Sequence, residues 1–262
     1  MNRRVALNLR RLSLVAAIFL VWEAITGGFG PAFQLVEPIL LARPSAALVE
    51  LGAYAASGLL AKDLSFTLSA AFAGLALGMV GGIAIGLLFG YFRTLAETVE
   101  PIFVALNSMP RIALAPVLIL AFGLGMASKV FLSFFTVFFV IFFNTYLGVL
   151  AVDPELVRAM RVMGGTRLDL ARYVILPSVF TWIFAALRTS VSFALTGAVV
   201  GEFVGSTAGL GYRMLISYGL LDTERTYAIL LLLMAVGTTL VEIAKRIEAR
   251  LLRWRPSAVL PQ

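Results

Sequence analysis

The residues that could do chemistry in this chain are few, and they stand out because they interrupt long apolar segments. Four charged side chains lie inside such segments: Glu23, Arg111, Arg188 and Glu202. The chain has no cysteine and no histidine, which excludes disulfides, thiolate zinc sites and nucleophiles that depend on histidine. No lysine or aspartate is expected inside these segments to replace them. We therefore predict that the chain is not an enzyme and binds no metal or cofactor itself.

Hydroxyl groups accompany one of these charges. Thr189, Ser192 and Thr196 follow Arg188 at a spacing that places all three hydroxyls on one face of a helix. Such a face offers a polar path through an apolar medium. We predict that an anionic solute moves along it, assisted by three residues: Arg188, Asn107 and Arg111.

Two of the charges have alternative roles. A charge in an apolar medium is costly, so it needs a partner or a polar cavity. Arg188 could instead pair with Glu23 or with backbone carbonyls, which would make its role structural. Glu202 is followed by a glycine-rich turn over residues 205–211, and it is predicted either to stabilise an external gate or to touch the solute.

The composition places the apolar segments in a membrane. The chain is 61% hydrophobic and 13% charged, with a mean hydropathy of +0.99, whereas a soluble domain is roughly 45–50% apolar and 25% charged. A bilayer core about 30 Å thick needs about 20 apolar residues per helix. Six runs meet this requirement: 12–29, 64–91, 101–122, 130–150, 174–204 and 227–247. The fifth run is the longest, so it should tilt or kink.

The distribution of basic residues predicts the orientation. The first run has a basic start like a signal peptide, but it is too long and lacks a small-residue cleavage site, so we expect a retained helix. If the six runs alternate, most of the 21 Lys and Arg residues fall on one side, which puts both termini in the cytoplasm. Topology thus accounts for the net charge of +7. We predict contact with membrane lipid and no nucleic-acid partner.

Two further patterns predict packing. Residues 44–60 open with Pro44-Ser45 and carry leucines at helical spacing but are too polar to span, so we expect a helix at the outer interface that serves as a packing element. The second run contains a glycine at every fourth position, which allows close approach of another helix of this chain or of a second copy. These glycines are Gly74, Gly78, Gly82, Gly86 and Gly90.

The loop over residues 151–177 contains residues that typically start and end short helices. Asp153 can cap a helix that Pro154 opens, and the Gly164-Gly165 pair can end it. Thr166, followed three residues later by an aspartate, can start a second short helix that leads into the fifth run. A knuckle with an apolar face and a basic rim suits insertion into a groove on a partner, although anionic lipid is an alternative ligand for its arginines.

At this point the chain resembles a known family, the permease subunits of bacterial ATP-binding cassette importers. Their cytoplasmic signature reads E-A-A, three residues, G, nine residues, I-x-L-P. Here Gly164 is followed by nine residues and then by Val174-Ile175-Leu176-Pro177. Arg158-Ala159-Met160 stands where the family has Glu-Ala-Ala, so only Ala159 matches. The resemblance covers essentially the whole chain.

Other segments resemble one subfamily. Residues 107–116 and 122–125 are similar to the third span of permeases for nitrate, aliphatic sulfonates and taurine, and residues 201–204 and 209–212 continue the similarity. Permeases for pyrimidine vitamin precursors and other small organic molecules share these motifs. The resemblance therefore implies import of a small, anionic solute, with a pyrimidine precursor as the alternative cargo.

The resemblance implies an all-α, six-span permease of the type I importer kind, forming a single transmembrane domain over residues 1–262 of a bacterial inner membrane. Its implied partners are a second permease copy, either identical or different, two ATPase subunits that carry ATP and Mg, and a periplasmic substrate-binding protein. The chain itself has no G-x-x-x-x-G-K-[ST] motif. Docking of the ATPase is expected on the loop at 151–173 and its continuation, through Glu155, Arg158, Ala159, Met160, Met163, Gly164, Gly165, Thr166, Arg167, Leu176 and Pro177.

A second class of transporter remains as an alternative. An ion-coupled secondary transporter would show inverted repeats, or broken helices with acidic groups near the midplane. No internal repeat is evident, and only Glu23 and Glu202 are candidate acids. A cassette permease is inert without its ATPase, whereas a secondary transporter acts alone.

Overall fold

The computed structural model describes residues 3–252, and in this part of the chain every regular element is helical. The long helices are α1 (Arg3–Ile25), α3 (Leu59–Tyr91), α4 (Arg93–Ser108), α6 (Met126–Leu150), α9 (Leu176–Val204) and α11 (Thr223–Leu251). The shorter ones are α2 (Pro44–Ala56), α5 (Ala115–Phe122), α7 (Pro154–Val162), α8 (Arg167–Leu170) and α10 (Leu210–Gly219). Two single 3-10 turns, at Pro31–Phe33 and Arg111–Leu114, and one π turn at Ala171–Ile175 join them.

Four continuous helical stretches within the described residues are long and apolar enough to cross a membrane. They are α3, α6, Arg167–Val204 and α11, which correspond to the second, fourth, fifth and sixth predicted spans. The third predicted span is broken, because α4 and the segment Arg111–Phe122 meet at 88°. The break falls at Met109-Pro110, because the proline ring cannot continue a helix. The first predicted span, 12–29, corresponds to α1, which ends at Ile25 because a turn begins at Thr26.

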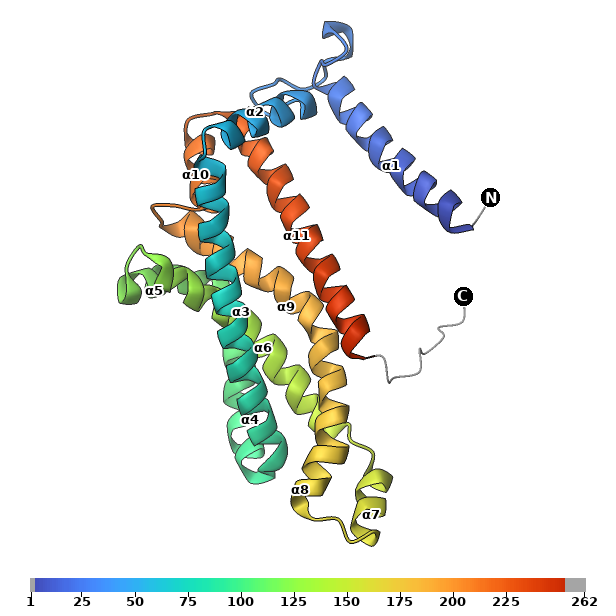
Figure 1. The fold of residues 1–262 in the computed structure, drawn as a ribbon. Coiled ribbons are helices and arrows are strands. Elements are labelled where there is room, and N and C mark those ends of the chain that lie inside the picture. The colour runs from blue at the N-terminus through green and yellow to red at the C-terminus, as the bar shows by residue number, and fades with distance from the viewer. Residues whose placement is uncertain (1–2, 253–262) are drawn as a thin grey trace.

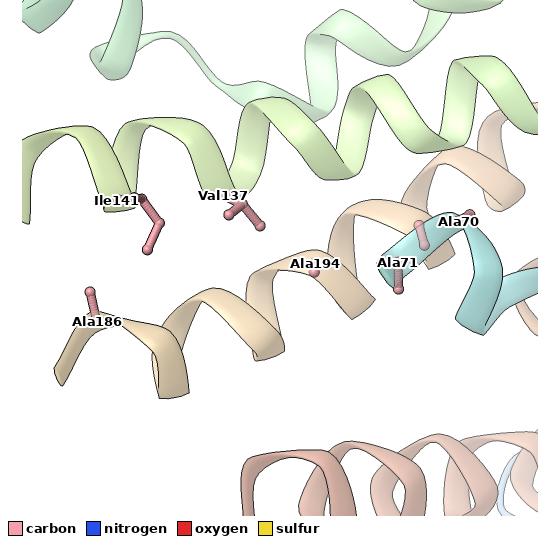
Figure 2. Packing of buried hydrophobic residues seen from close by; sticks show 7 residues of the cluster. Ala70, Ala71, Val137, Ile141, Ala186 and Ala194 are labelled. Atoms are coloured by element: carbon pink, nitrogen blue, oxygen red, sulfur yellow. The ribbon is translucent and has the colours of Figure 1, made fainter. Parts of the chain in front are cut away.

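The centre of the molecule is a bundle of α3, α6 and α9 (Figure 1). Small side chains line their contact, and Figure 2 shows Ala70 and Ala71 of α3 close to Ala194 of α9. A Cβ atom on Gly78, Gly82 or Gly86 would lie 2.7–2.9 Å from a side chain of α6. The glycines at steps of four therefore let α3 approach the α6 backbone of the same chain, one of the two partners considered above.

Aromatic side chains hold α4 beside this bundle. Phe89 of α3, Phe103 of α4 and Phe142 of α6 form a cluster in which ring centroids lie 4.7–5.2 Å apart. This spacing, and the edge-on geometry of the Phe89–Phe142 pair, are those that aromatic rings prefer. The cluster fixes α4 and therefore fixes the position from which the chain bends at Pro110.

The short helices α2 and α10 lie at one end of the bundle, and α7 and α8 project from the other end (Figure 1). Helix α2 was predicted over 44–60 but ends at Ala56, because Gly58 adopts a left-handed conformation (φ +75°) and α3 begins at the next residue. Helix α1 contacts α2 and stands apart from the central bundle. The bundle thus separates two functional ends.

Candidate functional site

The projecting loop between α6 and α9 is built from two strong local caps. The backbone N–H of Glu155 donates to the Asp153 side chain at 2.8 Å, which caps the start of α7. Gly164 has φ +78°, a left-handed conformation that ends α7 and turns the chain. The Met160 side chain folds back against Gly165, where an added Cβ would lie 2.6 Å from the Met160 sulfur. The corner is therefore specific for two glycines.

A capping box starts α8. The Thr166 hydroxyl donates to Asp169 at 2.6 Å, the Thr166 N–H donates to the same carboxylate oxygen at 2.9 Å, and the Asp169 N–H donates back to the Thr166 hydroxyl at 3.2 Å. The hydrogen bond from the Thr166 hydroxyl, with that from its backbone, lowers the pKa of Asp169. The carboxylate thus stays ionised and the box closed at neutral pH.

The loop presents unpartnered apolar surface within this chain. Val162, Met163 and Leu168 are 88%, 73% and 75% exposed. The basic side chains of Arg158, Arg161 and Arg167 are exposed beside them. The sequence pattern identified Met163 and the arginines, but Val162 and Leu168 were missed because they lie outside the predicted apolar face. The surface is a knuckle with an apolar tip and a basic rim, suited to a groove on another protein.

A π turn connects this knuckle to the bundle. Residues Ala171–Ile175 form the turn between α8 and α9, and Leu176 and Pro177 open α9. The second short helix was predicted to pass through Tyr173 into the fifth run, and the helical stretch Arg167–Val204 is continuous, with residues 171–175 in the π conformation. An apolar cavity of about 390 Å³ lies beside the joint, between Leu87, Tyr91 and Val149 on one side and Leu170 on the other. Rare π turns occur at functional positions, and the cavity, which is open on one side, leaves part of this turn uncovered by other residues of the chain.

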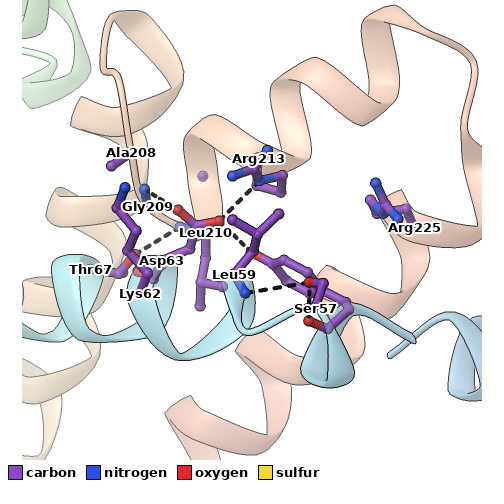
Figure 3. A network of polar contacts seen from close by, with 12 residues as sticks. Ser57, Leu59, Lys62, Asp63, Thr67, Ala208, Gly209, Leu210, Arg213 and Arg225 are labelled. Atoms are coloured by element: carbon purple, nitrogen blue, oxygen red, sulfur yellow. Dashed lines mark hydrogen bonds and ion pairs between the residues drawn. The ribbon is translucent and has the colours of Figure 1, made fainter. Parts of the chain in front are cut away.

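The opposite end of the bundle holds a buried polar network that the sequence did not reveal (Figure 3). Asp63, 1% exposed, accepts hydrogen bonds from the Tyr54 hydroxyl at 2.6 Å, the Gly209 N–H at 3.1 Å and Arg213 Nε at 2.9 Å. Burial and the neighbouring Asp63 raise the pKa of Tyr54, so its hydroxyl stays protonated and donates. Burial opposes ionisation of Arg213, but its bond to Asp63 outweighs this and raises the Arg213 pKa. The network joins α2, α3 and α10.

Glu202 extends this network at the end of α9. It is fully buried and accepts hydrogen bonds from the Thr67 hydroxyl at 3.0 Å and the Gly211 N–H at 2.8 Å. The Leu210 N–H in turn donates to the Thr67 hydroxyl oxygen at 2.9 Å. The other carboxylate oxygen, Oε1, has no hydrogen-bond partner. The structure therefore gives Glu202 contacts that hold the turn before α10, as the gate alternative requires.

Lys129 is buried as well, which corrects the expectation that no lysine or aspartate lies inside the apolar segments. It is 0% exposed, and its ammonium donates to the carbonyls of Leu124, at 2.6 Å, and of Gly205. It also contacts the Ser128 hydroxyl at 3.2 Å. Both carbonyls belong to loops, so the lysine ties the start of α6 to the end of α9. The sequence did not indicate this role, because Lys129 lies one residue before the predicted fourth span.

Arg188 pairs with an acidic side chain, as its structural alternative supposed, but the partner is not Glu23. Its guanidinium pairs with Glu248 of α11 at 2.9 Å. Glu23 instead caps α2, because it accepts hydrogen bonds from the Ser45 N–H at 3.0 Å and hydroxyl at 2.6 Å. Glu248 was not considered because it lies 60 residues beyond Arg188 and outside the sixth predicted span.

Arg111 and Asn107 do meet. The Arg111 guanidinium donates to Asn107 Oδ1 at 2.6 Å and lies 6.0 Å from the ring centroid of Phe139 and 5.9 Å from that of Phe193. The three predicted hydroxyl residues lie on the exposed part of α9 around Phe193: Thr189, Ser192 and Thr196. The structure thus brings together the third-span residues and the hydroxyl stripe, and it leaves Arg188 in a separate ion pair.

Comparisons with known proteins agree with this architecture. Residues 78–253 match the family described as "Binding-protein-dependent transport system inner membrane component". The chain is 35% identical over 242 residues to a riboflavin transport system permease of Chloroflexus aurantiacus, covering 92% of this chain and 88% of that protein. It is 30% identical over 249 residues to a putative aliphatic sulfonates transport permease of Bacillus subtilis, covering 95% and 88%. It is 32% identical over 241 residues to a formylaminopyrimidine transport permease of Halalkalibacterium halodurans, covering 91% and 92%.

A solved structure shows the same fold. An inward-facing methionine ABC transporter contains a chain that matches with a TM-score of 0.65 at 22% identity, covering 74% of this chain and 96% of that one. This likeness confirms the predicted all-α architecture of a type I importer permease. The chain belongs to the family of binding-protein-dependent transport system inner membrane components, and it is the permease subunit of an ABC importer.

Proposed function

We propose that this permease docks two copies of an ATPase on the knuckle formed by α7 and α8, and that ATP and Mg are held by those partners. The exposed apolar tip at Val162, Met163 and Leu168 carries this proposal. Removing such a patch from water is worth about 25 cal/mol per Å². The caps at Asp153 and Thr166 fix the knuckle's shape before binding, which lowers the entropy cost of docking.

Transport would proceed by alternating access. Closure of the ATPase pair moves the docked knuckle, and the π turn at Ala171–Ile175 passes the movement to α9. The helix then shifts the equilibrium between inward-facing and outward-facing states, which a partner can do only through different contacts in the two states. The π turn and the cavity beside it leave room for the knuckle to move relative to α9.

The full assembly is proposed by analogy with the family. We place both termini and the knuckle in the cytoplasm, and α2 and α10 at the periplasmic face, where a substrate-binding protein delivers the solute. A second copy of this permease completes the path, and a different permease chain is the alternative. The excess of basic residues on the knuckle side supports this orientation.

The cargo is proposed to be a small anion such as a sulfonate, nitrate or taurine. The sulfonate relative supports an anion, whereas the riboflavin and formylaminopyrimidine relatives support a small organic molecule as the alternative. Arg111, which lies beside the exposed hydroxyl stripe of α9, favours the anion.

Affinity purification of the chain from its native membranes tests the docking. Mass spectrometry is expected to find an ATPase in about equal amount with the wild-type chain and a binding protein with its ligand. Val162→Glu should release the ATPase, because it places a charge on the apolar tip. The matched control is Leu220→Glu, since Leu220 is 75% exposed at the opposite end of the bundle. Recovery of the chain alone, with transport that survives without ATP, would favour a secondary transporter instead.

A further inference from the structure

We infer that Arg111 binds the negatively charged group of a small oxyanion, such as a sulfonate, on the hydroxyl-bearing face of α9. This inference deepens the proposed import function and rests on it. Arg111 is the first residue after the break between α4 and α5, so its side chain enters the protein where the helix is interrupted. The site comprises Arg111, Asn107, Phe193 and the three hydroxyl residues of α9.

The contacts of Arg111 position it without neutralising it. A guanidinium has five N–H donors, and the hydrogen bond to Asn107 Oδ1 at 2.6 Å uses one nitrogen. The rings of Phe139 and Phe193, 6.0 and 5.9 Å away, stabilise the cation but leave its charge in place. Among the described residues, no carboxylate lies within ion-pair distance of Arg111. The remaining donors suit the paired oxygens of a sulfonate, carboxylate or phosphate.

The hydroxyl face of α9 surrounds the ring that Arg111 covers. Thr189, Ser192, Phe193 and Thr196 are spaced by three or four residues, so they share one face of the helix. All four are exposed within the chain, and Phe193 is 37% exposed. The Thr196 hydroxyl already donates to the Ser192 carbonyl at 3.0 Å, so the donors open to an anion held by Arg111 are the hydroxyls of Thr189 and Ser192, within about one helical turn. Without solute, these two hydroxyls need water, so the face belongs in an aqueous path.

Two other cations of the central helices, Arg188 and Lys129, are already committed. Arg188 pairs with Glu248 at 2.9 Å, which cancels its charge locally. Lys129 is 0% exposed and donates to backbone carbonyls, so a solute cannot reach it. This difference in partners separates Arg111 from Arg188, which the sequence alone placed together in the anion path.

The natural absence of cysteine allows a direct test. Ser192→Cys places one thiol on the hydroxyl face, and the permease is reconstituted in vesicles with its ATPase. The thiol is reacted with the anionic reagent 2-sulfonatoethyl methanethiosulfonate or with its cationic trimethylammonium counterpart. In each case the thiolate attacks the sulfenyl sulfur, a disulfide forms and methanesulfinate leaves. Mass spectrometry of this chain measures both rates.

The expected result is a charge preference that depends on Arg111. By Coulomb's law in water, a single charge at a separation of about 7 Å changes the ratio of anionic to cationic rates about sevenfold. Arg111→Gln should lower the ratio by about this factor, and Arg111→Lys should retain most of it. The control is the double variant Arg188→Gln with Glu248→Gln, which removes a neutral pair and should leave the ratio unchanged. An unchanged ratio in Arg111→Gln would overturn the inference. So would failure of both reagents to react, which would mean that the face meets lipid and that Arg111 holds a headgroup phosphate.

The result is separable from the docking proposal. Recovery of the ATPase with each variant is measured in the same preparation. If the ATPase is recovered but the charge preference does not depend on Arg111, the import function stands and the anion site is wrong. If the ATPase is absent from the wild-type preparation, the proposed function fails whatever the labelling rates show.

Discussion

Replacing Asp63 by alanine is predicted to destabilise the permease more than any exposed charge change. The Asp63 carboxylate is 1% exposed and accepts hydrogen bonds from Tyr54, Gly209 and Arg213 at 2.6, 3.1 and 2.9 Å. Its removal leaves three donors without an acceptor, and the Arg213 side chain is only 23% exposed. Breaking a buried ion pair in this way costs about 3–5 kcal/mol.

Thermal unfolding in detergent measures the effect. For a chain of this size, each 1 kcal/mol lowers the midpoint by about 2–4 °C, so we expect a loss of about 6–20 °C. Because heating is irreversible for many membrane proteins, all variants are compared at one scan rate. The control is Arg93→Gln, which breaks a pair with Glu97 whose side chains are 91% and 65% exposed, and no measurable shift is expected.

A double variant separates the ion pair from general damage. Asp63→Ala combined with Arg213→Met removes both charges, so it should be less destabilised than Asp63→Ala alone, because no unpaired guanidinium remains. If Asp63→Ala unfolds at the same temperature as Arg93→Gln, the network does not hold α10 to α3 and the reasoning is refuted.

Three further changes probe the packing and the knuckle. Gly82→Leu should lower stability by about 1–3 kcal/mol through overpacking against α6, whereas Gly52→Ala, where nothing lies within 4 Å of an added Cβ, should raise it by about 0.5–1 kcal/mol, both measured by thermal unfolding. Gly164→Ala forces a side chain into a conformation with φ +78°, at a cost of about 1–2 kcal/mol, so loop amides should exchange hydrogen faster. Because its hydrogen bonds with Thr166 lower the pKa of Asp169, the cap should persist down to about pH 4 and be lost as the pH falls further, through the folded pKa. Thr166 amide protection that fell near neutral pH would contradict this.

Features set by neighbouring residues could be predicted from the sequence. The Asp153 cap, the Gly164 corner and the box between Thr166 and Asp169 each depend on residues at most three apart, and each is present. The glycines at steps of four likewise define one face of α3 whatever it packs against. Local spacing carries this information because helix geometry fixes which neighbours can touch.

Features that depend on residues distant in sequence could not be predicted. Asp63 accepts from Gly209 and Arg213, which lie 146 and 150 residues further along the chain. Lys129 reaches the carbonyl of Gly205, 76 residues away. Asp63 and Lys129 each lie beside a predicted span, where water could solvate the charge. No local sequence pattern distinguishes a charged residue that stays in water from one that the fold buries. For the same reason, the ion pair between Arg188 and Glu248 was missed, and Arg188 was placed in the solute path.

Helix α9 links all three parts of the proposed mechanism. It begins at the π turn below the knuckle, carries the hydroxyl stripe in its middle and ends with Glu202 in the buried polar network. Ser133 of α6 donates to the Ala194 carbonyl at 2.9 Å, and the glycine contacts lock α3 to α6, so these three helices resist sliding past one another. A packed core is not continuously deformable, which favours movement of the bundle as a unit. In the proposed mechanism, a displacement that enters at the π turn would therefore reach Arg111 and the network around Asp63 together, which would couple solute binding to the closure of the far end.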